Sequence, residues 1–85
     1  MKFTVYWTPD AERDLAELWL NEPHLKADIT QAADEVDRLL RRDPEREGES
    51  RFEAARILFV PPLVVDYQVS PDDLRVDVIG LTLLP

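Results

Sequence analysis

The chain has no cysteine, two glycines and a single histidine, His24. The lack of cysteine excludes disulfides, cysteine-ligated metal sites and thiol nucleophiles. His24 follows Pro23, with no second histidine and no paired serine to complete a metal site or a nucleophilic pair. We interpret His24 as a solvated loop residue, and we expect neither a metal nor a cofactor.

Long hydrophobic runs are also missing. No apolar segment reaches the length of a membrane span, and the first residues lack the charged-then-apolar pattern of a secretory signal. We therefore expect a cytoplasmic protein that does not contact a membrane. Its 85 residues, 45% of them apolar, predict a single domain over residues 1–85.

Basic residues are scarce: 10 lysines and arginines stand against 18 acidic residues, for a net charge of −8. Only residues 38–56, with six arginines and five acids, are weakly basic. Tight nucleic-acid binding normally needs a basic face that releases phosphate counterions, so we do not expect direct nucleic-acid binding. Helix-dipole complementation and solvation explain the one basic cluster, with an acidic partner segment or nucleic acid as the alternative. This cluster comprises Arg38, Arg41, Arg42 and Arg46.

The spacing of the apolar residues predicts one strand, two helices and three further strands. Thr8 can cap the first helix with its hydroxyl, and Pro9 suits the first helical position. The two amphipathic helices should form an antiparallel hairpin, and the short connections after them favour an antiparallel meander. The expected elements are a strand over Lys2–Trp7, helices over Pro9–Leu20 and Leu25–Arg42, a polar connection over residues 43–53, and strands over Ala54–Val60, Leu63–Val69 and Leu74–Leu83.

This order defines an α+β fold, β-α-α-β-β-β. The two-helix hairpin packs on one face of a mainly antiparallel sheet and leaves the other face partly open. Apolar residues that share one side of a strand are the core candidates. They are Phe3, Val5 and Trp7 in the first strand and Val65, Tyr67 and Val69 in a later one, and Trp19 of the first helix is also expected in the core.

Several segments combine characteristic residues at characteristic spacings along the chain. Residues 3–11 form an aromatic strand that enters a Thr-Pro helix start, followed by an Asp-Leu pair at 14–15. Residues 29–44 form an apolar helix stripe that exits at Asp-Pro, and residues 56–58 and 65–69 read Arg-Ile-Leu and Val-Asp-Tyr-Gln-Val. Together they resemble the RelE/ParE superfamily of bacterial toxin–antitoxin toxins.

The resemblance implies a small toxin that a cognate antitoxin neutralises by wrapping its surface. RelE-like members bind the ribosomal A site and cleave mRNA with lysines, arginines and a C-terminal tyrosine or histidine. ParE-like members instead poison DNA gyrase. Here the tail Val78–Pro85 contains no Arg, Lys, His or Tyr, and Gln68 stands where the family has an arginine. The groups that would move a proton and stabilise phosphorane charge are therefore missing at the matching positions.

We interpret the chain as the toxin of a type II toxin–antitoxin module that acts by binding a protein, as ParE does. The resemblance implies an antitoxin as its partner and suggests DNA gyrase as its target, and no catalytic residue is assigned. Two alternatives stay open: a catalytically degenerate, non-toxic member that serves as a protein-binding module, and a weak ribosome-dependent mRNA endoribonuclease. A homodimer is also left open.

Three arginines are candidate contacts to phosphate or to an acidic partner: Arg51, Arg56 and Arg75. A guanidinium fork suits either ligand, and we expect Arg51 and Arg56 to reach the open face of the sheet. The simpler alternative for Arg51 and Arg56 is a surface ion pair, with Glu49, Glu53 or Asp66 as the acid.

The last strand has apolar or small residues on both faces. Ile79, Leu81 and Leu83 alternate along it and are candidate antitoxin contacts. If this strand lies at an edge of the sheet, a partner peptide can cover it by strand addition; the alternative is a strand buried inside the sheet.

Two acids, Asp66 and Asp77, are expected on adjacent strands and on one face of the sheet. Paired carboxylates can bind a divalent cation or act in acid–base chemistry. The alternative is that both simply face solvent, as alternating polar residues of a half-exposed sheet do.

Overall fold

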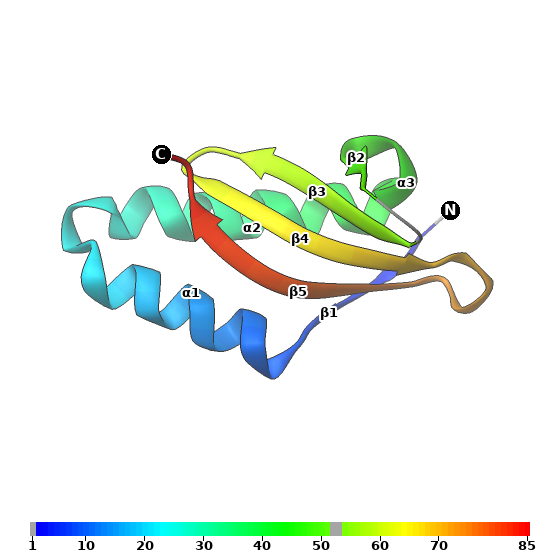
Figure 1. The fold of residues 1–85 in the computed structure, drawn as a ribbon, viewed down its shortest axis with the longest axis horizontal. Helices are drawn as coiled ribbons and strands as arrows, with labels where there is room; N and C mark the ends of the chain where they lie inside the picture. Colours follow the sequence, from blue (N-terminus) through cyan, green and yellow to red (C-terminus); the bar gives the residue numbers. More distant parts are fainter. Residues whose placement is uncertain (1, 52–53) are drawn as a thin grey trace.

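The computed structural model describes residues 2–51 and 54–85 and has the expected α+β architecture (Figure 1). Among these residues, no helix is long and apolar enough to cross a membrane. The elements in chain order are β1 (Thr4–Trp7), α1 (Pro9–Asn21), α2 (Lys26–Arg42), α3 (Pro44–Glu47), β2 (Glu49–Ser50), β3 (Ala55–Val60), β4 (Leu63–Ser70) and β5 (Arg75–Leu83), with 3-10 turns at Pro23–Leu25 and Pro71–Asp73.

The five strands form one mixed sheet in the order β1-β5-β4-β3-β2. Antiparallel pairing of β3 with β4 and of β4 with β5 confirms the meander. The first and last strands pair in parallel, with Thr4 opposite Arg75 and Trp7 opposite Val78. Of the two positions left open for the last strand, the structure shows the internal one, because β5 lies between β1 and β4.

The step from β1 to α1 depends on Thr8, as the sequence predicts. The Thr8 hydroxyl oxygen accepts a hydrogen bond from the backbone N–H of Ala11 at 3.2 Å, which caps the helix. The same hydroxyl donates to the carbonyl of Val78 at 2.9 Å. A single side chain thus starts the helix and ties its first turn to β5.

Helix α1 continues along β5 where β1 has ended. Strand β1 pairs only with residues 75–78 of β5. Further along β5, the backbone N–H of Leu81 donates to Asp14 Oδ2 on α1 at 3.1 Å. Gly80 leaves room for this approach, because a side chain there would meet the same carboxylate. A helix side chain therefore satisfies a strand N–H that no neighbouring strand reaches.

The hydrophobic core lies between the helices and one face of the sheet, and α2 runs along that face (Figure 1). The predicted stripe of α2 is confirmed at Ile29, Val36 and Leu40, all fully buried. The sheet contributes alternate residues, as a half-buried antiparallel sheet does. Those that are buried are Leu58, Leu63, Val65, Tyr67, Val69, Val76, Val78 and Leu81. Phe3, Val5 and Trp7 are half-buried and pack against them.

Trp19 does not pack in the core, contrary to the sequence-based expectation. Its side chain is 40% exposed near the C-terminal end of α1. The ammonium of Lys26 lies 4.1 Å from the centre of its ring, in a cation–π contact. Helical spacing places Trp19 at the apolar stripe of α1, but its ring contacts Lys26 at the start of α2 and not the sheet.

The polar connection predicted over residues 43–53 is partly structured. It contains α3 and β2, and β2 pairs antiparallel with β3; Phe52 and Glu53 lie outside the described residues. The buried phenol of Tyr67 donates to the carbonyl of Pro44 at 2.7 Å. This contact fastens α3 to the sheet from a residue far along the chain, which is why local sequence patterns do not reveal it.

Candidate partner-binding surface

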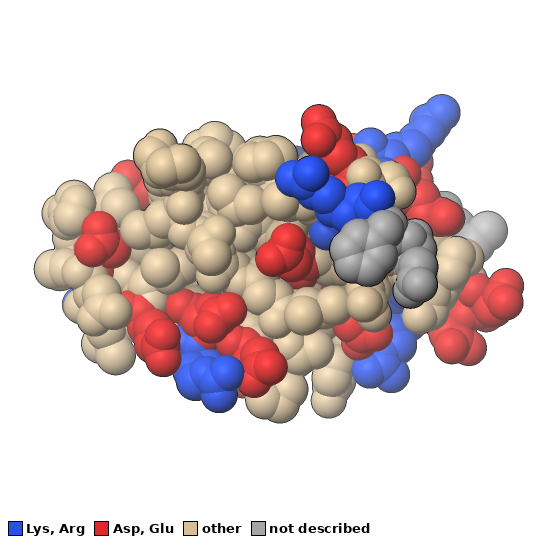
Figure 2. All heavy atoms as spheres, viewed as in Figure 1, with Lys and Arg blue, Asp and Glu red and all other residues tan. Residues whose placement is uncertain are grey.

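The face of the sheet opposite the helices is open and largely uncharged. Side chains alternate along a strand, so the residues between the core positions point to this face. In Figure 1 the sheet lies in front of α2, and Figure 2 shows the same side with uncharged surface over its upper centre and upper left, an acidic group near the centre and further acidic groups at the left and lower left. We call this surface the open sheet face. Its described residues include Tyr6, Ile57, Phe59, Val64, Asp66, Gln68, Asp77, Ile79 and Thr82.

Three large apolar side chains of the open sheet face are exposed to solvent. Tyr6 is 52% exposed, Phe59 47% and Ile79 38%, and they come from β1, β3 and β5. Large apolar and aromatic residues gathered on a surface typically mark a protein interface, whereas single ones are ordinary. The geometry of this face therefore suits contact with another polypeptide.

The position of Ile79 depends on an irregularity in β5. The register of β5 against β4 shifts between Gly80, which is opposite Asp66, and Val78, which is opposite Tyr67. Ile79 is the extra residue, as in a β-bulge. One extra residue reverses the side to which all later residues point.

The three candidate antitoxin contacts therefore do not share a face. Ile79 is exposed on the open sheet face, whereas Leu81 is 4% exposed within the core and Leu83 is half-buried against it. Simple alternation predicted all three on one side, and the bulge explains the difference. Leu81 is inaccessible to a partner in this fold. Ile79 is the member of the three that a partner can reach most readily.

Arg56 lies on the helix-covered side of the sheet, which corrects the prediction that it reaches the open face. It stands opposite Tyr67 in the β3–β4 pairing. Its Nε donates to the Tyr67 hydroxyl at 3.3 Å, and its terminal nitrogen donates to the carbonyl of Gly48 at 2.5 Å. The Arg56 guanidinium is therefore used to hold the β2–β3 corner.

Burial raises the pKa of the Tyr67 phenol above its ordinary value, while the hydrogen bond from Arg56 acts in the opposite direction. The phenol is consequently neutral at physiological pH and donates its proton to the Pro44 carbonyl. Tyr67, Arg56 and Gly48 form a structural anchor for α3 and β2. Sequence reasoning placed Tyr67 in the core, which is confirmed, but no local signal indicated its polar contacts.

Arg75 is on the open side but is paired within the chain. Its Nε donates to Asp77 Oδ1 at 2.9 Å, and its guanidinium lies 4.7 Å from the centre of the Tyr6 ring. Arg51 is exposed beside β2. The three candidate arginines therefore do not converge, because Arg56 and Arg75 point to opposite faces of the sheet.

Asp66 and Asp77 do share the open face, as predicted. Asp66 on β4 is opposite Gly80. Asp77 on β5 is opposite Gln68, and Gln68 follows Asp66 by two residues on β4. Asp77 bonds Arg75. Across the described residues, no three histidine or acidic side chains gather as a metal-binding group. The solvent-facing alternative fits this arrangement best.

Three of the four arginines of the predicted basic cluster are paired with acids close by in the chain. Arg38 pairs with Glu35, Arg41 with Asp37 at 2.8 Å, and Arg46 with Asp43 at 3.7 Å. A hydrogen bond from Arg38 lowers the pKa of the Glu35 carboxyl. Pairs three or four residues apart on exposed helix surface are the ordinary arrangement of a solvated face.

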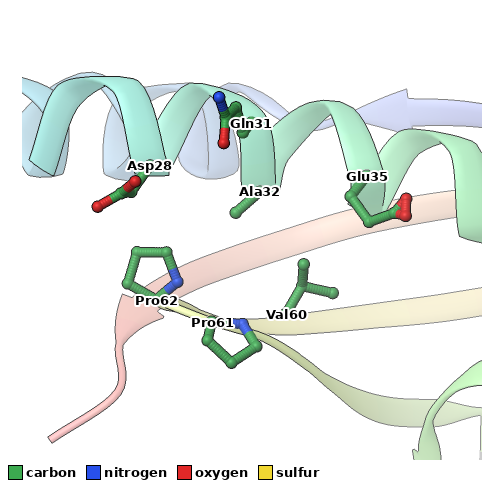
Figure 3. A pocket seen from close by; sticks show the side chains of 7 residues that line it. All are labelled: Asp28, Gln31, Ala32, Glu35, Val60, Pro61 and Pro62. Carbon is green, nitrogen blue, oxygen red and sulfur yellow. The ribbon is translucent and has the colours of Figure 1, made fainter.

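A groove of about 490 Å³ lies between α2 and the turn that joins β3 to β4 (Figure 3). Ala32 points into it from the helix, across from Pro61 and Pro62 of the turn. Its remaining lining residues are Asp28, Gln31, Glu35 and Val60. No sequence pattern singles out this groove, because the helix and the turn come together only in the folded protein.

The fold places the chain among solved toxin–antitoxin structures. A chain of the toxin–antitoxin complex RelBE2 from Mycobacterium tuberculosis superposes with a TM-score of 0.76 and 21% identity, over 99% of this chain and 93% of that one. A chain of the chromosomal ParDE toxin–antitoxin system of P. aeruginosa gives a TM-score of 0.75 and 16% identity, over 99% and 98%. No family model and no curated protein sequence matches the chain. The RelE/ParE-like toxin fold expected from the sequence is therefore confirmed.

Proposed function

We propose that this protein is the toxin of a type II toxin–antitoxin module, that it acts in the cytoplasm by binding a protein, and that a cognate antitoxin neutralises it. The observation that carries the proposal is the exposure of Tyr6, Phe59 and Ile79 on the open sheet face. It occurs in a fold shared with chains of two toxin–antitoxin systems. An apolar face of this kind is covered in a complex and accessible in the free protein.

The arginines support protein binding over cleavage of RNA. Phosphoryl chemistry needs cations aimed at the charge that develops on the phosphate. Arg56 donates hydrogen bonds to Tyr67 and Gly48, and Arg75 is paired with Asp77. A ParE-like action on DNA gyrase is accordingly our proposal for the target, and ribosome-dependent mRNA cleavage is the alternative that the test must distinguish.

The proposal is tested by inducing the protein in a bacterial host, alone and together with the product of its adjacent reading frame. We expect growth arrest with the toxin alone and recovery when the neighbour is co-expressed. A harmless protein that nevertheless binds its neighbour tightly would identify a non-toxic binding module. Purified toxin should then inhibit supercoiling by DNA gyrase. Ribosome-dependent cuts in mRNA, mapped by primer extension, would overturn the protein-binding mechanism.

A further inference from the structure

The groove between α2 and the β3–β4 turn has two chemically different sides. Asp28, Gln31 and Glu35 are spaced three, four and seven residues apart, so they share one face of α2. Opposite them, Val60, Pro61 and Pro62 form an apolar wall, and Ala32 forms the floor (Figure 3). The groove thus combines an acidic rim with an apolar interior.

The two carboxylates of the rim differ in their partners. Glu35 is engaged by Arg38 on the same helix. Asp28, which lies across from Pro62, forms no ion pair within the described residues (Figure 3). The cationic side chain of a partner would therefore be attracted most strongly to the Asp28 carboxylate, beside the wall formed by Pro61 and Pro62. Glu35 would contribute a weaker attraction because Arg38 already neutralises it.

The groove adjoins the open sheet face. Phe59 is exposed on that face, and Val60, the next residue of β3, lines the groove. Strand β2 pairs only with Arg56 and Ile57, so within the described residues it does not border the last part of β3. A polypeptide that covers Phe59 can therefore pass over this part of the strand and enter the groove without meeting another element.

We propose that this groove receives a segment of the antitoxin in which a lysine or arginine lies next to a small or branched apolar residue. The basic group binds at Asp28 with support from Glu35, and the apolar side chain packs on Pro61, Pro62 and Ala32. Charge complementarity selects this occupant, because the rim is acidic and the chain as a whole carries −8. The inference rests on the proposed toxin function and specifies the chemistry of the partner.

The test uses the folded, full chain and a library of random short peptides displayed on phage. Peptides enriched on the wild-type protein are synthesised, and their dissociation constants are measured for three variants. Asp28→Asn removes the rim carboxylate that has no ion-pair partner among the described residues, and Gln31→Trp fills the groove. Asp34→Asn is the matched control, since Asp34 is an acid of the same helix outside the groove. Thermal unfolding establishes that each variant is folded.

We expect enriched peptides with a basic residue beside an apolar one. Asp28→Asn should weaken their binding by about tenfold, which corresponds to about 1.4 kcal/mol, and the loss should shrink as salt is added. Gln31→Trp should weaken it as well, and Asp34→Asn should not. The inference is overturned if no peptide is enriched, if enriched peptides lack basic residues, or if they bind both groove variants as tightly as the wild type.

This result can be separated from the proposed function. If the wild-type protein fails to arrest growth but binds basic–apolar peptides in the groove, the inferred chemistry of the groove's ligand holds, whereas the toxin proposal, and with it the antitoxin as occupant, fails. If the protein arrests growth and Asp28→Asn is neutralised by antitoxin as well as the wild type, the toxin proposal holds and the groove inference fails. If both hold, Asp28→Asn arrests growth and needs more antitoxin for recovery.

Discussion

The carboxylate of Asp14 on α1 and the backbone N–H of Leu81 on β5 are joined by a hydrogen bond of 3.1 Å. The side chain of a helix here takes the place of a neighbouring strand. The Asp14 carboxylate satisfies the partly buried N–H of Leu81 and holds α1 beside β5. We therefore expect the protein to lose stability when the Asp14 carboxylate is removed.

Asp14→Ala should lower the free energy of unfolding by about 1–3 kcal/mol, because the Leu81 N–H loses its acceptor in a partly buried place. Urea denaturation followed by circular dichroism measures this change. Glu17→Ala is the control, since Glu17 is an exposed acid of the same helix. An equal effect of the two substitutions would show that the hydrogen bond contributes nothing.

The two glycines should respond differently to alanine. A Cβ at Gly48 would come within 2.5 Å of the backbone carbonyl oxygen of Ile57, whereas at Gly80 the nearest atom is the Asp14 carboxylate at 3.3 Å. Backbone cannot move aside as a side chain can. Gly48→Ala should therefore cost about 1–3 kcal/mol of stability and Gly80→Ala clearly less. Paired melting curves test this order, and a reversed order would contradict it.

Tyr67 should make the protein sensitive to alkaline pH. Its pKa is raised in the folded state by burial, so the stability linked to its neutral phenol is fully present below the ordinary value of 10.0. That stability is lost as the pH rises through the higher folded-state value. Unfolding free energies measured across this alkaline range should fall.

Tyr67→Phe should remove this part of the alkaline decline. At neutral pH it should cost about 1–3 kcal/mol, because the Pro44 carbonyl and Arg56 lose their partner. Tyr6→Phe serves as the control for a general alkaline effect, since Tyr6 is exposed on β1. The same decline in Tyr67→Phe as in the wild type would exclude Tyr67 as its source.

Phe59→Lys should separate binding from folding. Phe59 is 47% exposed, so the change should alter the free energy of unfolding by no more than about 0.5 kcal/mol. Burying a lysine in a proposed apolar interface should weaken antitoxin binding by at least about tenfold. Leu20→Lys is the control, because Leu20 is 67% exposed at the end of α1. Titration calorimetry with purified antitoxin gives both affinities, and similar values would place the interface elsewhere.

Features set by neighbouring residues were predictable from the sequence. The Thr8 cap, the Pro9 helix start, the break at Pro23 and the meander all depend on residues a few positions apart. The stripe of α2 was also predictable, because helical periodicity directly gives its buried side. For the same reason the order of elements and the fold class could be expected correctly.

Features set by distant residues were not predictable. The internal position of β5 depends on parallel pairing with β1, and no turn signal reports such pairing. The bulge at Ile79 moves Leu81 and Leu83 to the core side, although simple alternation placed all three together. The anchor between Tyr67 and Pro44 and the groove at Pro61 exist only after the chain has folded back on itself.

Strand β5, which joins β1 to the meander, is the last of the described strands in chain order. Until the residues of β5 have left the ribosome, β4 lacks one neighbour and β1 has none to pair with in this sheet. Contacts between such distant segments form late and slow the folding of small domains. The open sheet face is therefore complete only once β5 has joined the sheet. A partner that recognises the complete open sheet face can therefore bind it only after β5 has joined β1 to the meander.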